Sequence, residues 1–260
     1  MIKFVKEYWK TLLFFGIAGL FGGFFTGLYV LDSYSEGLKQ QLIESINTAG
    51  LGQYPVDILI GVITALQSAS YGVILGAIGI IFGKKTGLWK DERGIKTIPL
   101  TLTLIVAVVG GLVMILPDIL FFNNHFDAIR DSYATKPSVP YILASVVYGG
   151  VIEEVMLRLF WMSLVAFIFW KIFARDNSEP TTGVLICANV VSALLFAAGH
   201  LPATFQMLGS DPLIIARCMI LNGGIGLLFG YLYRKFGLRY SMIAHAGCHV
   251  VSKLIWILFI

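Results

Sequence analysis

Seven long apolar stretches, separated by short polar loops, organise the chain. A helix needs about 20 mostly apolar residues to cross a membrane, and the stretches that satisfy this cover residues 11–31, 56–82, 98–122, 141–173, 183–200, 213–233 and 240–260. The polar loop at 32–55 carries apolar residues at helical spacing, which predicts a short interfacial helix. We therefore expect an all-α, polytopic membrane helical bundle with about seven transmembrane helices.

Basic residues alternate between successive loops. They gather in the N-terminal tail, at 83–96, at 171–175 and at 233–239, while the other loops hold few. The positive-inside rule then predicts a cytoplasmic N-terminus and an outward C-terminus. We expect one integral membrane domain over residues 1–260, with N-terminal spans in 1–140 and the motif-bearing spans in 141–260. Pro117 is expected to shorten or kink the third span.

Composition narrows the class of protein. The chain of 260 residues is 57% hydrophobic and 13% charged, and its mean hydropathy is +0.83, which excludes an ordinary soluble domain. The net charge of +4 lies in short loops beside apolar segments, so we expect no nucleic-acid partner. Cys187, Cys218 and Cys248 all fall in apolar segments without a CxxC motif, which argues against a disulfide framework or a thiolate metal site. The N-terminal lysines precede a long apolar run without a cleavage motif, and this predicts an uncleaved first span.

Three ionisable residues interrupt the fourth apolar stretch. Glu153, Glu154 and Arg158 stand within GGVIEEVMLR, where each charge at bilayer depth costs from roughly 2.5 to over 10 kcal/mol unless it is paired. Glu154 and Arg158 are four residues apart in the order that favours an ion pair on a helix. Glu153 lies about 100° round that helix and has no partner there. Glu153 is therefore the candidate for chemistry.

The length of this stretch predicts an irregularity. Its 33 residues would span roughly 50 Å as an α-helix, against a hydrocarbon core of about 30 Å. The helix must therefore tilt, protrude or break. The pair Gly149-Gly150, just before the glutamates, is the expected place for a bend or a close helix approach.

Three histidines also fall in membrane segments. His200 ends the fifth stretch, with Phe196 four residues earlier, and His245 and His249 share one face of the last stretch. The fourth histidine, His125, lies in a polar loop and is expected to be solvated. A single intramembrane histidine is usually a packing residue with a hydrogen bond. Three of them together with an unpaired glutamate favour a functional site.

The chemistry that this set could perform is hydrolysis, in one of two ways. Glu153 and His200 could activate a water while His245 and His249 stabilise the oxyanion of a peptide carbonyl. Alternatively, His200, His245 and His249 could bind Zn²⁺ with Glu153 as fourth ligand or base. The HxxxH spacing suits a metal, but the glutamate of an HExxH motif is absent.

The motifs EExxxR at 153–158, FxxxH at 196–200 and HxxxH at 245–249 resemble, in this order, those of the CAAX protease and bacteriocin-processing (CPBP, or Abi) family. The resemblance covers about residues 141–260. It implies an all-helical intramembrane endopeptidase, similar to the enzymes that remove the last three residues of prenylated CAAX proteins. It also implies that the first glutamate and first histidine, here Glu153 and His200, activate water, and that His245 helps to hold the oxyanion.

One position departs from the family pattern. The last motif usually ends in Asn or Asp, and His249 stands there instead. A neutral histidine can still donate one hydrogen bond, but His249 also adds a potential metal ligand and puts retained activity in doubt. A non-catalytic membrane regulator or immunity protein is therefore the alternative, and a proton-relay transporter a third. The expected partners are the lipid bilayer and a peptide or lipidated protein, and the expected location is a prokaryotic plasma membrane.

Arg217, in the sixth stretch, is expected to extend its side chain to the membrane interface, with a contact to a substrate carboxylate or lipid phosphate as the alternative.

Overall fold

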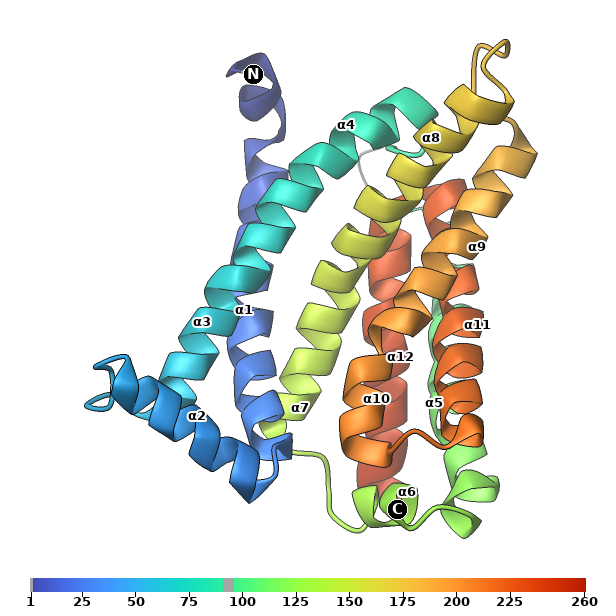
Figure 1. Ribbon diagram of the computed structural model, residues 1–260. Helices are drawn as coiled ribbons and strands as arrows, with labels where there is room; N and C mark the ends of the chain where they lie inside the picture. Colours follow the sequence, from blue (N-terminus) through green and yellow to red (C-terminus); the bar gives the residue numbers. More distant parts are fainter. Residues whose placement is uncertain (1, 91–95) are drawn as a thin grey trace.

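Helices make up every regular element that the structure describes. The computed structural model covers residues 2–90 and 96–260 (Figure 1). The α-helices are α1 (Ile2–Ser33), α2 (Glu36–Thr48), α3 (Val56–Ser70), α4 (Gly76–Thr86), α5 (Thr97–Leu120), α6 (Asp127–Ser132), α7 (Val139–Leu143), α8 (Ser163–Phe173), α9 (Thr182–Gly199), α10 (Leu201–Leu208), α11 (Pro212–Phe236) and α12 (Leu238–Phe259). Three π-helical segments, η1 (Tyr71–Leu75), η3 (Ala144–Glu153) and η4 (Val155–Met162), and one 3₁₀ turn, η2 (Phe122–Asn124), complete the described chain.

Seven of the described helical segments are long and apolar enough to cross a membrane, which confirms the predicted all-α membrane bundle. They are Lys3–Ser33, Val56–Thr86, Thr97–Asn124, Val139–Phe173, Thr182–Leu208, Pro212–Phe236 and Leu238–Phe259. The two ends of the chain lie at opposite ends of the bundle, as an odd number of spans requires (Figure 1). The protein is thus an integral membrane protein.

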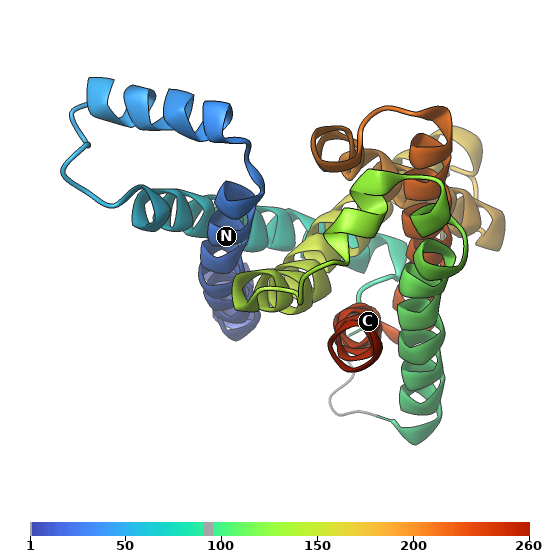
Figure 2. The same ribbon diagram turned by 90° about the horizontal axis from the view of Figure 1, so that it is seen from below.

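Two local predictions outside the motif-bearing spans can be compared with the structure. The helix expected in the polar loop is α2, which stands clear of the bundle when it is seen from below (Figure 2). Pro117 does not end the third span, because α5 continues through it to Leu120. Part of the basic loop at 83–96 lies outside the described residues, namely 91–95.

The segment from Val139 to Phe173 is one continuous helix at the centre of the molecule, with α1 on one side and α12 on the other (Figure 1). It does not break at Gly149-Gly150. Instead, η3 and η4 widen the helix into successive π-helical stretches around the glutamates. Local π-helical turns concentrate at functional sites because they redirect side chains. The irregularity in this span is therefore a wider helix around the glutamates rather than a break.

The glycine pair permits the close helix approach that the sequence predicts. A Cβ atom on Gly150 would lie 2.7 Å from the Cβ of Ala246 on α12, and one on Gly149 would lie 3.1 Å from the Nε2 atom of His249. The first distance is shorter than real Cβ atoms show, and the second is tight enough that the His249 ring would have to shift slightly. These two glycines therefore set the spacing between the central helix and the helix that carries two of the histidines.

The prediction for Arg217 is wrong. Its guanidinium is paired through two hydrogen bonds with Asp118 of α5, whose side chain is buried. Tyr133 donates a third hydrogen bond to the same carboxylate at 2.9 Å. Burial beside Asp118 raises the pKa of the Tyr133 phenol, which keeps it a donor. Sequence spacing could not reveal this pair because its members are 99 residues apart.

Substitution of Gly150 by alanine tests the close approach. The new methyl group would overlap Ala246, and overpacking of this kind costs about 1–3 kcal/mol of folding free energy. Gly224→Ala is the matched control, because a Cβ there meets nothing within 4 Å. Thermal unfolding in detergent is expected to show a lower melting temperature for Gly150→Ala and an unchanged or higher one for Gly224→Ala. Equal melting temperatures for the two variants would contradict this packing.

Candidate functional site

The two adjacent glutamates occupy different environments. Glu154 is fully buried, and its Oε2 lies 3.5 Å from the Nε of Arg158, which confirms the ion pair predicted from the four-residue spacing. Glu153 is partly exposed and forms no pair with Arg158 in the structure. The ion pair thus engages the Glu154 carboxylate inside the protein, and the Glu153 carboxylate stays accessible.

The Arg158 side chain, on the central helix, contacts both α9 and α11. It is fully buried, and its Nη2 donates a 3.2 Å hydrogen bond to the carbonyl oxygen of Gly226 on α11. The guanidinium carbon lies 4.7 Å from the ring centre of Phe196 on α9 and 5.6 Å from that of Phe229 on α11. Cation–π contacts gain strength when they are desolvated. Arg158 therefore anchors α9 and α11 to the central helix.

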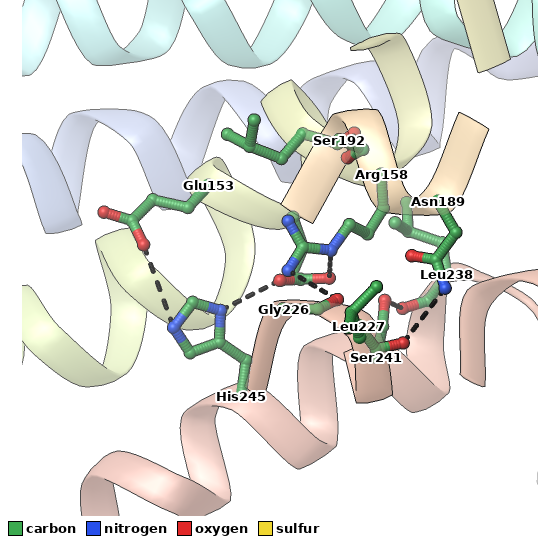
Figure 3. Close-up of polar contacts among 11 residues, drawn as sticks. Glu153, Arg158, Asn189, Ser192, Gly226, Leu227, Leu238, Ser241 and His245 are labelled. Carbon is green, nitrogen blue, oxygen red and sulfur yellow. Dashed lines mark hydrogen bonds and ion pairs between the residues drawn. The ribbon is translucent and has the colours of Figure 1, made fainter. Parts of the chain in front are cut away.

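His245 of α12 lies between the two carboxylates. Its Nδ1 is 2.9 Å from Oε1 of Glu154, and its Nε2 is 3.8 Å from Oε2 of Glu153. Figure 3 shows the ring between Glu153 and Arg158. Because an ionised carboxylate only accepts hydrogen bonds, Nδ1 is the donor to Glu154. The ring also stacks on Phe229, with centroids 4.5 Å apart, so its orientation is fixed on two sides.

His249 continues the same face one helical turn later. Its ring stacks on that of His245 at a centroid distance of 5.1 Å. Its Nδ1 is buried and has no hydrogen-bond partner among the described residues. A buried polar atom without a partner is uncommon in native proteins and marks a candidate contact for a ligand. The absence of a side chain at Gly149 leaves the room that this imidazole occupies.

His200 closes α9 and reaches the cluster through an aromatic ring. The Phe196 ring makes edge-to-face contacts with His200 at 4.7 Å and with His245 at 5.6 Å. The Nδ1 of His200 is 2.8 Å from the carbonyl oxygen of Phe196, and a carbonyl can only accept, so Nδ1 carries the proton. In a neutral ring Nε2 is then the acceptor. The short helix α10 begins directly after His200, with Pro202 in its first turn.

The predicted zinc ligands do not form a metal site as the side chains lie. Within the described ranges, no three or more His, Cys, Asp or Glu side chains are grouped so that they could hold a metal ion. The Nδ1 of His245 is used by Glu154, and the rings of His245 and His249 are stacked rather than pointed at a common centre. The donors therefore do not fit the three-histidine arrangement.

Several residues of the site carry no signal in the sequence. Phe229 and the Gly226 carbonyl hold His245 and Arg158, but they stand in an apolar, glycine-rich stretch that looks like ordinary packing. Ser192 of α9 donates a 2.7 Å hydrogen bond to the carbonyl oxygen of Leu157 in η4. His125 lies apart from the site as an exposed loop residue, as expected.

Comparison with known proteins gives one result for this region. Residues 135–251 match the family model described as type II CAAX prenyl endopeptidase Rce1-like. No curated protein and no solved structure matches the chain. The matched range includes every candidate residue described above: Glu153, Glu154, Arg158, His200, His245 and His249. Over residues 135–251 the chain is thus similar to the CAAX-type membrane proteases, which supports its assignment to the CPBP family.

Proposed function

We propose that the protein is an intramembrane endopeptidase that cleaves a membrane-associated substrate by activating water with Glu153 and His200. The observation that supports this most strongly is the separation of roles between the two glutamates. Glu154 forms an ion pair with Arg158 and accepts a hydrogen bond from His245. Glu153 stays partly exposed, with its carboxylate 3.8 Å from the Nε2 of His245. That distance is too long for a direct hydrogen bond. It lets both groups contact one substrate carbonyl and its attacking water.

The proposed reaction assigns each group a role that suits its hydrogen-bonding state. Glu153 takes a proton from water, assisted by the Nε2 acceptor of His200, and the resulting hydroxide bonds to the carbonyl carbon. The carbonyl electron pair moves to oxygen. When the tetrahedral intermediate collapses, the carbon–nitrogen bond breaks and Glu153 returns the proton to the leaving amine.

In this proposal His245 and His249 stabilise the oxyanion. Since Nδ1 of His245 donates to Glu154, a second donor at Nε2 requires a doubly protonated ring. That cation would balance the cluster, because Glu153 and Glu154 supply two negative charges and Arg158 and His245 two positive ones. Buried charges persist when they are paired in this way. The unpartnered His249 adds one more donor.

The substrate class follows from the family rather than from any single side chain. A type II CAAX prenyl endopeptidase acts on prenylated C-termini, so we propose a prenylated protein or a small membrane peptide as substrate, presented from the bilayer. The excess of Lys and Arg in the loops beside the N-terminal end of the bundle supports a cytoplasmic N-terminus. We place the protein in a prokaryotic plasma membrane.

One observation favours a second function. His249 replaces the Asn or Asp that usually ends the last family motif, and a member that has lost this group could serve as a non-catalytic regulator or immunity protein with the same polar network. Such a protein would fold around Glu154 and Arg158 and cleave nothing.

The same substitution at the two adjacent glutamates separates catalysis from structure. Glu153→Gln is expected to lower kcat/KM by about 10²–10⁴-fold, because it removes the base while the fold stays intact. Glu154→Gln is expected to lower stability by about 3–5 kcal/mol, because Arg158 stays buried without its counter-charge. Cleavage of a farnesylated peptide and thermal unfolding in detergent measure the two effects, and Glu44→Gln on the exposed face of α2 is the control.

A result in which Glu153→Gln cleaves like wild type would remove Glu153 from the mechanism. Cleavage lost by both variants without any loss of stability would contradict the structural role of Glu154.

His249 variants and metal analysis distinguish the two hydrolytic mechanisms. If the mechanism uses no metal, His249→Asn is expected to retain activity, because the amide also donates a hydrogen bond. His249→Ala is expected to lower kcat by about 10²–10³-fold. Chelators are expected to have no effect, and elemental analysis of the purified protein is expected to find no stoichiometric zinc. One zinc per chain, lost together with activity on chelation and in His249→Asn, would establish the metal alternative instead.

A further inference from the structure

Lys253 is a buried cation on the same face of α12 as the two histidines. Residues 245, 249 and 253 recur every four positions, and Lys253 is only 4% exposed. Its Nζ lies 4.1 Å from the ring centre of Tyr141, which itself stacks on Tyr29. No acidic side chain of the described residues forms an ion pair with it. A buried ammonium without a counter-charge is costly, which makes it a candidate for binding an anion.

Lys253 lies along the same helix–helix interface as the proposed site. The central helix and α12 run antiparallel, so that Tyr141 meets Lys253, Gly149 meets His249, and Glu153 meets His245. The lysine thus continues the row of polar side chains away from the glutamates.

A purely structural role fits Lys253 poorly. A lysine that extends to the membrane interface ends in an exposed ammonium, whereas Lys253 as a whole is only 4% exposed. Lys136 instead takes the exposed position near the end of α12, where it donates to the carbonyl oxygen of Ile257 at 3.0 Å. The buried acid Asp118 is already occupied by Arg217 and Tyr133. Among the described residues, Lys253 therefore has an aromatic ring as its neighbour but no anion.

The distance along α12 from His245 to Lys253 is close to the length of three extended residues. His245 and Lys253 are eight residues apart, which corresponds to about 12 Å along the helix axis. Three residues of extended chain span at most about 10–11 Å. Lysine has a long, flexible stem, so its ammonium can take up a difference of this size. A peptide held with its scissile carbonyl at His245 would reach Lys253 with its third following residue.

We propose that Lys253 binds the free C-terminal carboxylate of the substrate and so fixes the cleaved bond three residues from the chain end. This inference rests on the proposed protease function and names its specificity-determining contact. A substrate that enters from the end of the bundle where α12 begins, with its carboxyl end leading, meets His245 before Lys253. The ammonium then pairs with the terminal carboxylate, and the Tyr141 ring holds it in position.

The test compares two substrates and three variants. A farnesylated peptide that ends in cysteine and three further residues is offered with a free C-terminal carboxylate or with a C-terminal carboxamide. Wild type is expected to favour the free acid by about 30-fold or more in kcat/KM, as for other buried charge pairs. Lys253→Met is expected to cleave both peptides at the rate that wild type shows for the amide. Lys253→Arg is expected to keep most of the preference, and Lys171→Met, an exposed lysine of α8, all of it.

A stability measurement separates binding from packing. Since Lys253→Met removes an unpaired buried charge, its melting temperature in detergent is expected to equal or exceed that of wild type. A large decrease together with an unchanged acid preference in the variant would assign Lys253 to packing and overturn the proposal.

The remaining outcomes are also distinct. Equal cleavage of acid and amide by wild type would overturn the carboxylate contact and leave the protease function standing. If folded wild type cleaves neither peptide, the proposed function and the carboxylate contact fall together. If Lys253→Met does not fold, the acid-to-amide ratios of wild type and Lys253→Arg decide, because a ratio near one in wild type is sufficient to contradict the inference.

Discussion

The buried ion pair between Glu154 and Arg158 is the interaction on which the rest of the site depends. Both side chains are fully buried within a membrane-spanning helix, where neither charge would be stable alone. The pair also fixes its neighbours. Glu154 orients the His245 ring through Nδ1, and Arg158 holds the Gly226 carbonyl and the Phe196 ring. One electrostatic contact therefore positions parts of α9, α11 and α12 around the central helix.

The backbone makes this arrangement possible. The glycine pair lets α12 approach the central helix until the imidazoles of His245 and His249 lie over the backbone at Gly149. The π-helical stretches on either side of Glu154 widen the turns that carry the two glutamates. Glu153 is then partly exposed while Glu154, its direct neighbour, is fully buried. The proposed protease site needs both, since a structural carboxylate and a reactive one must not compete for the same cation.

The sequence predicted the elements and contacts that depend on local or periodic patterns. It did not predict contacts between residues that are far apart along the chain. The seven spans, α2, and the Glu154–Arg158 pair follow from hydropathy windows and from four-residue spacing, both of which are written into short segments. The pair of Asp118 with Arg217 could not be found, because no periodicity links α5 to α11. The π-helical widening was also missed: the sequence predicted an irregularity in this stretch from its length, but not its form. The catalytic roles of Glu153, His200, His245 and His249 stay predictions.

The most direct test of the proposed hydrolysis traces the oxygen atom that water contributes to the cleaved product. Purified wild-type protein in liposomes is given a farnesylated CAAX-type peptide in water enriched in ¹⁸O, and both products are analysed by mass spectrometry. Water activated at Glu153 predicts a new carboxylate on the prenylated fragment that carries one ¹⁸O atom, and a released tripeptide without label. Intact peptide after incubation with folded protein, or cleavage at a bond elsewhere in the peptide, would contradict the account.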